Sequence, residues 1–253
     1  DGIRDVAVTG VQTCALPIFI DHVEFAIHAG EVLGVAGVEG NGQFELCEAI
    51  LGQVAPSAGT VHIGGADVSG TSPHERLING LSYIPLDRHR EGLLLNAPLW
   101  ENTLLGRDAD PQFQRGPFVD SAATRADSRT IIEQFDVRTP SEVVPAYALS
   151  GGNQQKLLVG RELSSNPKVL IAAHPTRGVD IGAQAAIWDR LRTARDQGLA
   201  VLLISADLEE LIGLSDNIVV MFDGHINARL TPAEATPELL GTYMTGGSQE
   251  KAS

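Results

Sequence analysis

The sequence predicts an α/β fold with a parallel-sheet core. Short apolar runs such as KVLIAA (168–173) and AVLLIS (200–205) have the length and composition of strands buried on both faces. A helix-compatible segment, GAQAAIWDRLRTARDQG (182–198), lies between these two runs. Alternation of buried strands with helices is typical of parallel sheets covered by helices.

The amino-terminal third contributes strands, a loop and a helix. HVEFAIHAGEVLGVAG (22–37) alternates apolar and polar residues, turns at Ala29-Gly30, and continues as an apolar strand that ends in a glycine-rich loop. FELCEAILG (44–52) predicts a helix with a glycine end. GTVHIGGADV (59–68) predicts a hairpin, and GLSYIPLDR (80–88) a further strand.

From about Asn96 to Lys168 the pattern becomes helical and more polar, which predicts a helical subdomain. Its helix candidates are SAATRADSRTIIEQF (121–135) and GGNQQKLLVGRELSSN (151–166). Beyond it we expect a helix at DLEELIGL (207–214) and the strand pair NIVVMFDG and HINARL (217–230). Residues 247–253 are expected to be a flexible tail.

Composition excludes several classes of protein. The 253 residues are 43% hydrophobic, enough for one sizeable core or two fused lobes. A formal charge of −14 argues against a protein that reads a nucleic-acid backbone. Because no apolar run approaches the ~20 residues that span a bilayer, any membrane role requires a partner. Two cysteines, Cys14 and Cys47, are too few for a disulfide scaffold and fit a reducing compartment.

Residues 1–18 resemble translated sequencing-adapter DNA. In the matching frame, adapter sequence encodes VTGVQTCALPI, as at Val8–Ile18, and DGIRD, as at Asp1–Asp5. The segment shows neither strand alternation nor helical period, and it lacks the basic start and long apolar centre of a signal peptide. We expect it to be an adapter-derived, non-native segment without regular structure, followed by the natural chain from Phe19.

Two motifs indicate anion binding. GVAGVEGNGQFEL (34–46) contains G-x-x-x-x-G from Gly37 to Gly42, a weak signal alone because glycines also serve tight turns. LSGGNQQK (149–156) places a serine and two glycines at a helix start, where unpaired N–H groups face an anion. VLIAAHPTRGVD (169–180) follows as an apolar strand that runs into a Pro-Thr turn.

These motifs, at this spacing, resemble the nucleotide-binding domain of ABC transporters. Together with IPLDRHREGL (84–93), they are similar to the second, C-terminal domain of the tandem ATP-binding subunits of simple-sugar and nucleoside importers. In that family two such domains meet head to tail, and each nucleotide is held by the phosphate loop of one domain and the signature helix of the other. The resemblance implies a P-loop NTPase fold of ABC type over residues 19–246, with a mixed sheet core, an antiparallel β-subdomain and a helical signature subdomain.

Six positions depart from the family's hydrolytic pattern. By that resemblance, the replacements are Gln43 for the phosphate-loop lysine, Phe44 for the Mg²⁺-binding hydroxyl, Leu86 for the Q-loop glutamine, Ala173 for the Walker B aspartate, His174 for the catalytic glutamate and Ala206 for the switch histidine. Phosphoryl transfer depends on positioning and on neutralisation of charge by the metal and the lysine. We therefore expect no catalytic residue and no metal ligand in this chain, and little or no ATPase activity from the chain alone.

What remains of the loop is a weak nucleotide cradle. It comprises Gly37, Gly40, Asn41, Gly42, Gln43 and Phe44. A histidine such as His174 can polarise water near neutral pH. Without Mg²⁺ or the lysine there is no bound γ-phosphate to attack, so we expect a structural role for His174.

The signature segment is intact. By resemblance, Ser150, Gly151, Gly152, Asn153 and Gln154 contact ATP that is held mainly by a partner domain. Asp180 matches the D-loop, which supports the opposite site, although a lone Asp in this place equally suits a helix cap. DRHREG (87–92) brings three basic residues together, and they face either a membrane partner or solvent as a charged turn.

The expected function is the energy-coupling, ATP-binding part of an ABC importer for simple sugars or nucleosides. The expected partners are a second nucleotide-binding domain, in the same native chain or another subunit, and ABC permease subunits, without nucleic acid. The expected location is the cytoplasmic face of the inner or plasma membrane, as a peripheral protein. Two alternatives are a non-catalytic regulatory or scaffold module, and a soluble ABC-type ATPase that acts on nucleic acid.

Overall fold

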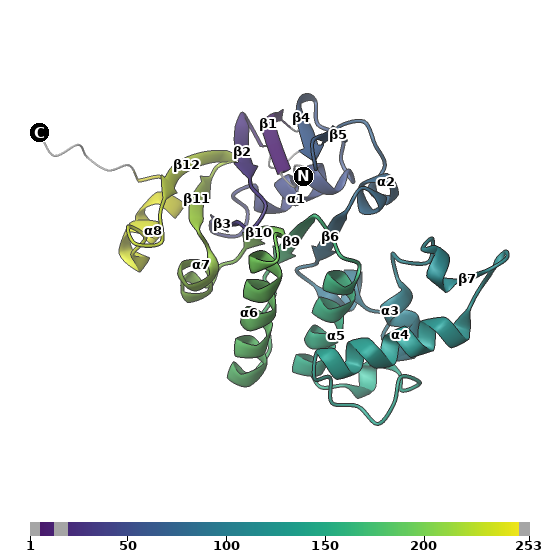
Figure 1. Ribbon diagram of the computed structural model, residues 1–253. Helices are drawn as coiled ribbons and strands as arrows, with labels where there is room; N and C mark the ends of the chain where they lie inside the picture. The colour runs from purple at the N-terminus through teal and green to yellow at the C-terminus, as the bar shows by residue number, and fades with distance from the viewer. Residues whose placement is uncertain (1–5, 13–19, 248–253) are drawn as a thin grey trace, which may run out of the picture. The chain divides into compact units, whose positions relative to one another are not determined.

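The computed structural model describes the backbone of residues 6–12 and 20–247, with side chains from Ile20 onward (Figure 1). The chain divides into two compact units. Unit 1 comprises the chain up to Leu81, residues 168–174, and the chain from Arg192 onward. Unit 2 comprises residues 82–167 and 175–191.

Unit 1 contains a mainly parallel sheet. The central strand β3 (Val32–Ala36) pairs in parallel with β10 (Ala200–Ile204) and with β11 (Asn217–Phe222). Strand β9 (Val169–Ala173) extends the sheet beyond β10, and β12 (His225–Leu230) pairs antiparallel with β11. Every residue of β3, β9 and β10 is buried, as the apolar runs predicted.

A second, antiparallel sheet of unit 1 has the strand order β2-β1-β4-β5. Its strands are β1 (Val6–Gln12), β2 (Val23–Ile27), β4 (Ala58–Ile63) and β5 (Ala66–Asp67). The predicted hairpin at 59–68 is confirmed by the pairing of β4 with β5.

Strand β1 corrects the expectation that residues 1–18 lack regular structure. Val6 pairs with Ile27 of β2 and with Ile63 of β4. Pairing of this kind uses backbone groups, and VAVTGVQ is rich in the β-branched residues that favour strands. Of the remaining residues of this segment, 1–5 and 13–18 lie outside the described part of the chain, as does most of the expected tail, 248–253.

The described residues of unit 1 include helices α1, α2, α7 and α8 and the end of α6. Helix α1 (Gln43–Leu51) follows the glycine-rich loop and ends at Gly52, as predicted, and its Cys47 is buried. Helix α7 (Leu208–Leu214) lies where a helix was predicted. Helices α2 (Pro73–Ile78) and α8 (Pro237–Met244) were not predicted.

Unit 2 is mainly helical. Strand β6 (Leu81–Ile84) leads into it, and its helices are α3 (Leu99–Leu104), α4 (Ser121–Gln134), α5 (Gly151–Ser164) and most of α6 (Ile181–Asp196). Shorter elements are the π-helical turn η1 (Arg88–Gly92), the 3-10 turns η2 (Pro111–Phe113) and η3 (Ala146–Ala148), and the hairpin of β7 (Gln114–Arg115) and β8 (Phe118–Val119). Its core includes Leu99 of α3, Ile131 of α4 and Leu157 of α5.

The buried side chain of Arg76 donates hydrogen bonds to the carbonyl end of α1. Its side chain is only 1% exposed, and Nη1 donates to the carbonyls of Ala49 and Ile50, both at 2.7 Å. Nη2 donates to the carbonyl of Ser69 at 3.1 Å. The last carbonyls of a helix have no intrahelical partner, so this buried guanidinium satisfies groups that otherwise lose solvation.

We expect Arg76→Ala to lower the free energy of unfolding by about 3 kcal/mol, because it removes a buried side chain and its hydrogen bonds to the carbonyls of Ala49, Ile50 and Ser69. Urea unfolding monitored by circular dichroism measures the change. His74→Ala, on the exposed side of the same helix, serves as the control and is expected to stay within about 0.5 kcal/mol of the parent. Equal stability of the two variants would contradict this role of Arg76.

Candidate nucleotide site and signature segment

The glycine-rich loop joins the carboxyl end of β3 to the start of α1. Gly40 and Gly42 have φ angles of 95° and 102°, a region that favours glycine. A Cβ at Gly42 would lie 3.1 Å from the Met221 side chain, so the loop also lies close to the end of β11. Asn41 anchors the loop by donating to the carbonyl of Met244 at 3.1 Å.

Gln43 lies inside this loop. Its side chain is 8% exposed, and Nε2 donates to the carbonyl of Val38 at 3.3 Å. A Cβ at Gly37 would overlap the Gln43 amide, so the glycine is required by the position of the glutamine. The N–H of Asn41 also donates to Val38, at 3.1 Å, which occupies part of the expected backbone cradle.

Phe44, next in sequence, is 45% exposed and has no oxygen to offer a metal. Ala173, at the end of β9, is buried and equally lacks a ligand atom, as does Leu86 in unit 2. Mg²⁺ prefers oxygen ligands, so the residues at these positions do not fit the ion. Within the described residues there is no group of three or more His, Cys, Asp or Glu side chains that could hold a metal.

His174 connects the loops that follow β9 and β10. Its backbone N–H donates to the carbonyl of Ile204 at 2.7 Å, and its ring Nδ1 accepts from the N–H of Ala206 at 3.3 Å. In the neutral ring this contact places the proton on Nε2. The φ angle of 48° is unusual for a residue other than glycine and is held by these two contacts. Both contacts are consistent with a structural role.

The signature segment begins α5 in unit 2. Ser150 is exposed and is the N-cap: its Oγ accepts from Asn153 N–H at 3.4 Å and from Asn153 Nδ2 at 2.9 Å. A Cβ at Gly152 would lie 3.1 Å from the Cβ of Ala183, so α5 and α6 approach closely here. Asn153 is itself held, since its Oδ1 accepts from the N–H of Arg138 at 2.8 Å.

Gln154, by contrast, points into its own unit. It is 5% exposed, and Nε2 donates to the carbonyl of Ala146 at 3.1 Å. Its Oε1 lies 2.8 Å from His89 Nε2 and 3.4 Å from Arg88 Nε. The expectation from resemblance placed Gln154 with the residues that face a partner's ATP, whereas the structure uses its amide inside unit 2.

Asp180 caps α6. Its Oδ1 accepts from the N–H of Ala183 at 2.9 Å, and this bond is the main reason that the pKa of Asp180 lies below its ordinary value. The positive charge of Lys156 lowers the pKa further. The carboxylate therefore stays ionised at neutral pH, and the cap interpretation accounts for its contacts within unit 2.

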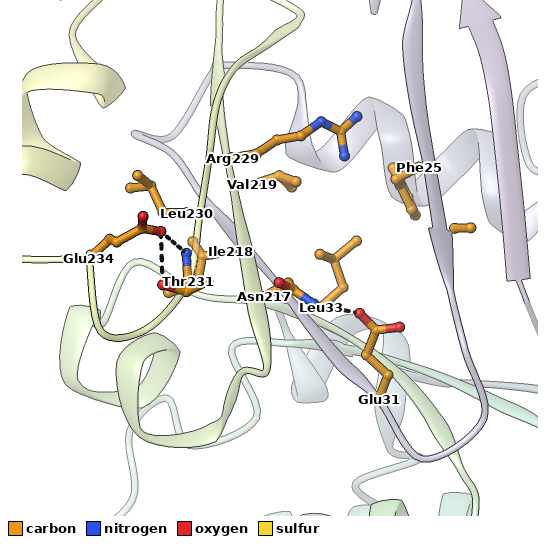
Figure 2. A pocket seen from close by; sticks show the side chains of 11 residues that line it. Phe25, Glu31, Leu33, Asn217, Ile218, Val219, Arg229, Leu230, Thr231 and Glu234 are labelled. Atoms are coloured by element: carbon orange, nitrogen blue, oxygen red, sulfur yellow. Dashed lines mark hydrogen bonds between the residues drawn. The ribbon is translucent and has the colours of Figure 1, made fainter. Parts of the chain in front are cut away.

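A cavity of about 250 Å³ lies elsewhere in unit 1 (Figure 2). Leu33 and Glu31 line it near the start of β3, whereas the glycine-rich loop follows the end of that strand. Figure 2 shows Arg229 above the cavity and Asn217 below it, with Glu31 accepting from Asn217 Nδ2 at 2.9 Å. The cavity is thus separate from the candidate nucleotide loop.

A strand, a glycine-rich loop and a helix at the carboxyl edge of a parallel sheet define the P-loop class of nucleotide-binding folds. The ABC transporter family model matches residues 20–177. The chain therefore belongs to the ABC transporter family, as the resemblance implied.

Relatives and solved structures agree with this assignment. The chain is 41% identical, over its whole length, to the guanosine import ATP-binding protein NupO of Bacillus subtilis (strain 168), of which it covers 48%. It is 37% identical over 97% of its length to the ribose import ATP-binding protein RbsA of Jannaschia sp. (strain CCS1), of which it covers 47%. The chain thus spans about half the length of these relatives.

A nucleotide-free ATP-binding cassette from an ABC transporter has the same fold, with a TM-score of 0.79 and 21% identity over 94% of this chain and 98% of that one. The predicted fold class is confirmed.

We expect Gln43→Lys to tighten ATP binding to this chain by about 10- to 100-fold, because it adds one charge-assisted contact of about 1.5–3 kcal/mol. Phe44, Ala173 and His174 remain, so we expect no phosphate release. Titration with a fluorescent ATP analogue and a phosphate-release assay measure the two effects.

Gln53→Lys makes the same change of charge at an exposed position beyond α1 and serves as the control. Equal tightening by both variants would show that net charge, not the loop, causes the effect. Phosphate release by the Gln43→Lys chain would contradict the assignment of the missing ligands.

Proposed function

We propose that this chain is the non-hydrolytic nucleotide-binding domain of an ABC importer. It supplies its signature segment to ATP held by the phosphate loop of a partner nucleotide-binding domain. The partner is a second domain of the same native chain or a separate subunit. The observation that carries the proposal is the contrast between the two motifs: Ser150 is exposed at an intact helix start, while Gln43 fills the chain's own loop.

The chemistry of Ser150 supports this role. Both of its hydrogen bonds with Asn153 use Oγ as the acceptor, so the hydroxyl proton can be donated to a phosphate oxygen. The backbone N–H groups at the start of α5 and the positive end of the 14-residue helix also favour a phosphate. ATP on the partner would close the pair of domains, and its hydrolysis would reopen the pair.

The chain's own loop lacks the means for hydrolysis. Phosphoryl transfer requires a cation against the phosphates and a residue that orients the attacking water. Gln43 has no charge, Phe44 has no metal-binding oxygen, and His174 contacts the backbone of Ala206. Loss of two charge-assisted contacts alone weakens binding by about 10²- to 10⁴-fold. We infer that productive ATP is held mainly by the partner.

The names of the relatives support the solute class that we propose. Their names refer to import of guanosine and of ribose, which fits simple sugars or nucleosides as solutes of this importer. Within the described residues, no helix combines the length and apolar character needed to cross a membrane. We propose that permease subunits hold the chain at the cytoplasmic face and that motion of the domain pair acts on them near Leu86 and the helical part of unit 2.

We propose separately that residues 1–18 are encoded by adapter DNA. Sequencing reads mapped across the Ile18–Phe19 junction test it, and uniform genomic coverage through the junction would exclude it. Strand β1 does not decide the question, because backbone pairing is open to any compatible extended segment.

We expect Ser150→Arg to lower the ATPase activity of the assembled domain pair by about 100-fold or more, because it removes a hydroxyl donor and places bulk at the phosphate contact. Ser121→Arg, at the exposed first residue of α4, is the matched control and is expected to keep wild-type activity. Activity of Ser150→Arg within about twofold of the parent would refute the role in trans and favour a scaffold function.

A further inference from the structure

The DRHREG segment is the strongest feature that the proposed function leaves unexplained. Residues Arg88–Gly92 form the π-helical turn η1, and Asp87 caps it by accepting from the N–H groups of His89 and Arg90 at 3.0 and 3.2 Å. The sequence suggested a basic surface for a membrane partner or for solvent. In the structure Arg90 is exposed, whereas Arg88 and His89 both contact Gln154 of the signature helix.

Arg88 joins three segments of unit 2. Nη1 donates to the carbonyl of Arg177 at 2.8 Å, and Nε donates to Gln154 Oε1 at 3.4 Å. Nη2 lies against the signature itself: a Cβ at Gly151 would be 2.9 Å from it, and one at Gly178 would be 3.6 Å away. A side chain at position 151 would therefore displace the guanidinium, whereas one at position 178 would only contact it. Arg88 thus lies between the first turn of α5 and the turn that precedes α6.

The partners of Arg88 are themselves fixed. Gln154 is held by the carbonyl of Ala146 and by its contact with His89 Nε2. Arg161, further along α5, is buried and donates to the carbonyl of Gly92 at 2.7 Å. Turn η1 is thus attached to α5 at both of its ends, and only Asp87 separates it from Leu86.

Stability of α5 does not account for an arginine at this place. The amino end of a helix carries partial positive charge, so a cation beside it is unfavourable. Burial lowers the pKa of Arg88, opposed by the charge of Asp87, yet a guanidinium remains protonated at neutral pH. Hydrogen bonds to Arg177 and Gln154 oppose this repulsion in the isolated domain, and a phosphate at the same helix start would attract both the guanidinium and the helix end.

We propose that Arg88 is a positioning residue for the signature motif: its planar fork fixes the first turn of α5 against the Arg177–Gly178 turn, so that Ser150 is presented to ATP on the partner domain. This inference rests on the proposed function and adds one residue to it. A lysine is not equivalent here, because its one nitrogen cannot occupy the positions of both Nη1, which donates to Arg177, and Nε, which donates to Gln154.

The test compares Arg88→Lys and Arg88→Ala in the assembled transporter. We expect both to raise KM for ATP about tenfold, the loss expected for one charge-assisted contact, with kcat changed by less than about twofold. Arg90→Lys and Arg90→Ala, at an exposed position of the same turn, are the matched controls and are expected to keep the wild-type KM.

Thermal melting separates positioning from folding. A lowered melting temperature with an unchanged KM would overturn the proposal, and so would a wild-type KM for Arg88→Lys, which would show that charge alone suffices. Where Arg88→Ala is poorly folded, Arg88→Lys decides, because it keeps the aliphatic stem and the charge. Ser150→Arg, measured alongside, separates failure of this inference from failure of the proposed function. If Ser150→Arg has no effect on ATPase activity, the proposed function fails. If Ser150→Arg loses activity while the Arg88 variants keep the wild-type KM, only the inference about Arg88 is rejected.

Discussion

The parallel pairing of β3 with its neighbours is the constraint on which unit 1 depends. Carboxyl ends of parallel strands meet at one edge of a sheet, so the loops after β3, β9 and β10 are brought to the same edge. These loops carry the glycine-rich segment, His174 and Ala206. The packing of β3 is close: a Cβ at Gly34 would overlap the Ser215 side chain and lie 3.1 Å from Leu211 of α7. The frame of a phosphate loop therefore follows from the sheet, whatever side chains the loop contains.

Within this frame, polar side chains of the loops form hydrogen bonds to neighbouring backbone groups. Gln43 donates to Val38 from inside the loop, and Asn41 bonds the turn between β11 and β12 through the N–H of Asp223 at 3.2 Å. At the loop after β9, the His174 ring accepts a hydrogen bond from the N–H of Ala206. Buried polar groups need partners, and here backbone groups of the protein supply them. The replacements thus stabilise the loop's shape.

The sequence predicted those elements whose pattern is set by burial, and it missed those set by tertiary contacts. The buried strands and the long helices α4, α5 and α6 were visible because apolar runs and periodicity follow directly from packing. Helices α2, α3 and α8 have six to eight residues and were missed, whereas α7, with seven residues, was predicted from its leucine-rich segment DLEELIGL. Strand β1 was not predicted because its sequence has no alternating pattern, and its structure depends on pairing with β2 and β4. The side-chain orientations of Gln43, Arg88 and Gln154 were also not predicted. The rotamers of long polar side chains depend on neighbours that are distant in sequence.

The glycine-rich loop and the signature segment are held by separate sets of contacts. The side-chain hydrogen bonds of the loop, to Val38, Asp223 and Met244, lie within unit 1. Those of the signature segment, to Arg88, Arg138 and Ala146, all lie within unit 2. Substitutions at sites that share no partners are expected to be nearly additive in free energy. A change at Gln43 is therefore expected to have little structural effect on Ser150. Under the proposed function, selection on a contact in trans would preserve the signature segment even where the chain's own loop does not hydrolyse ATP.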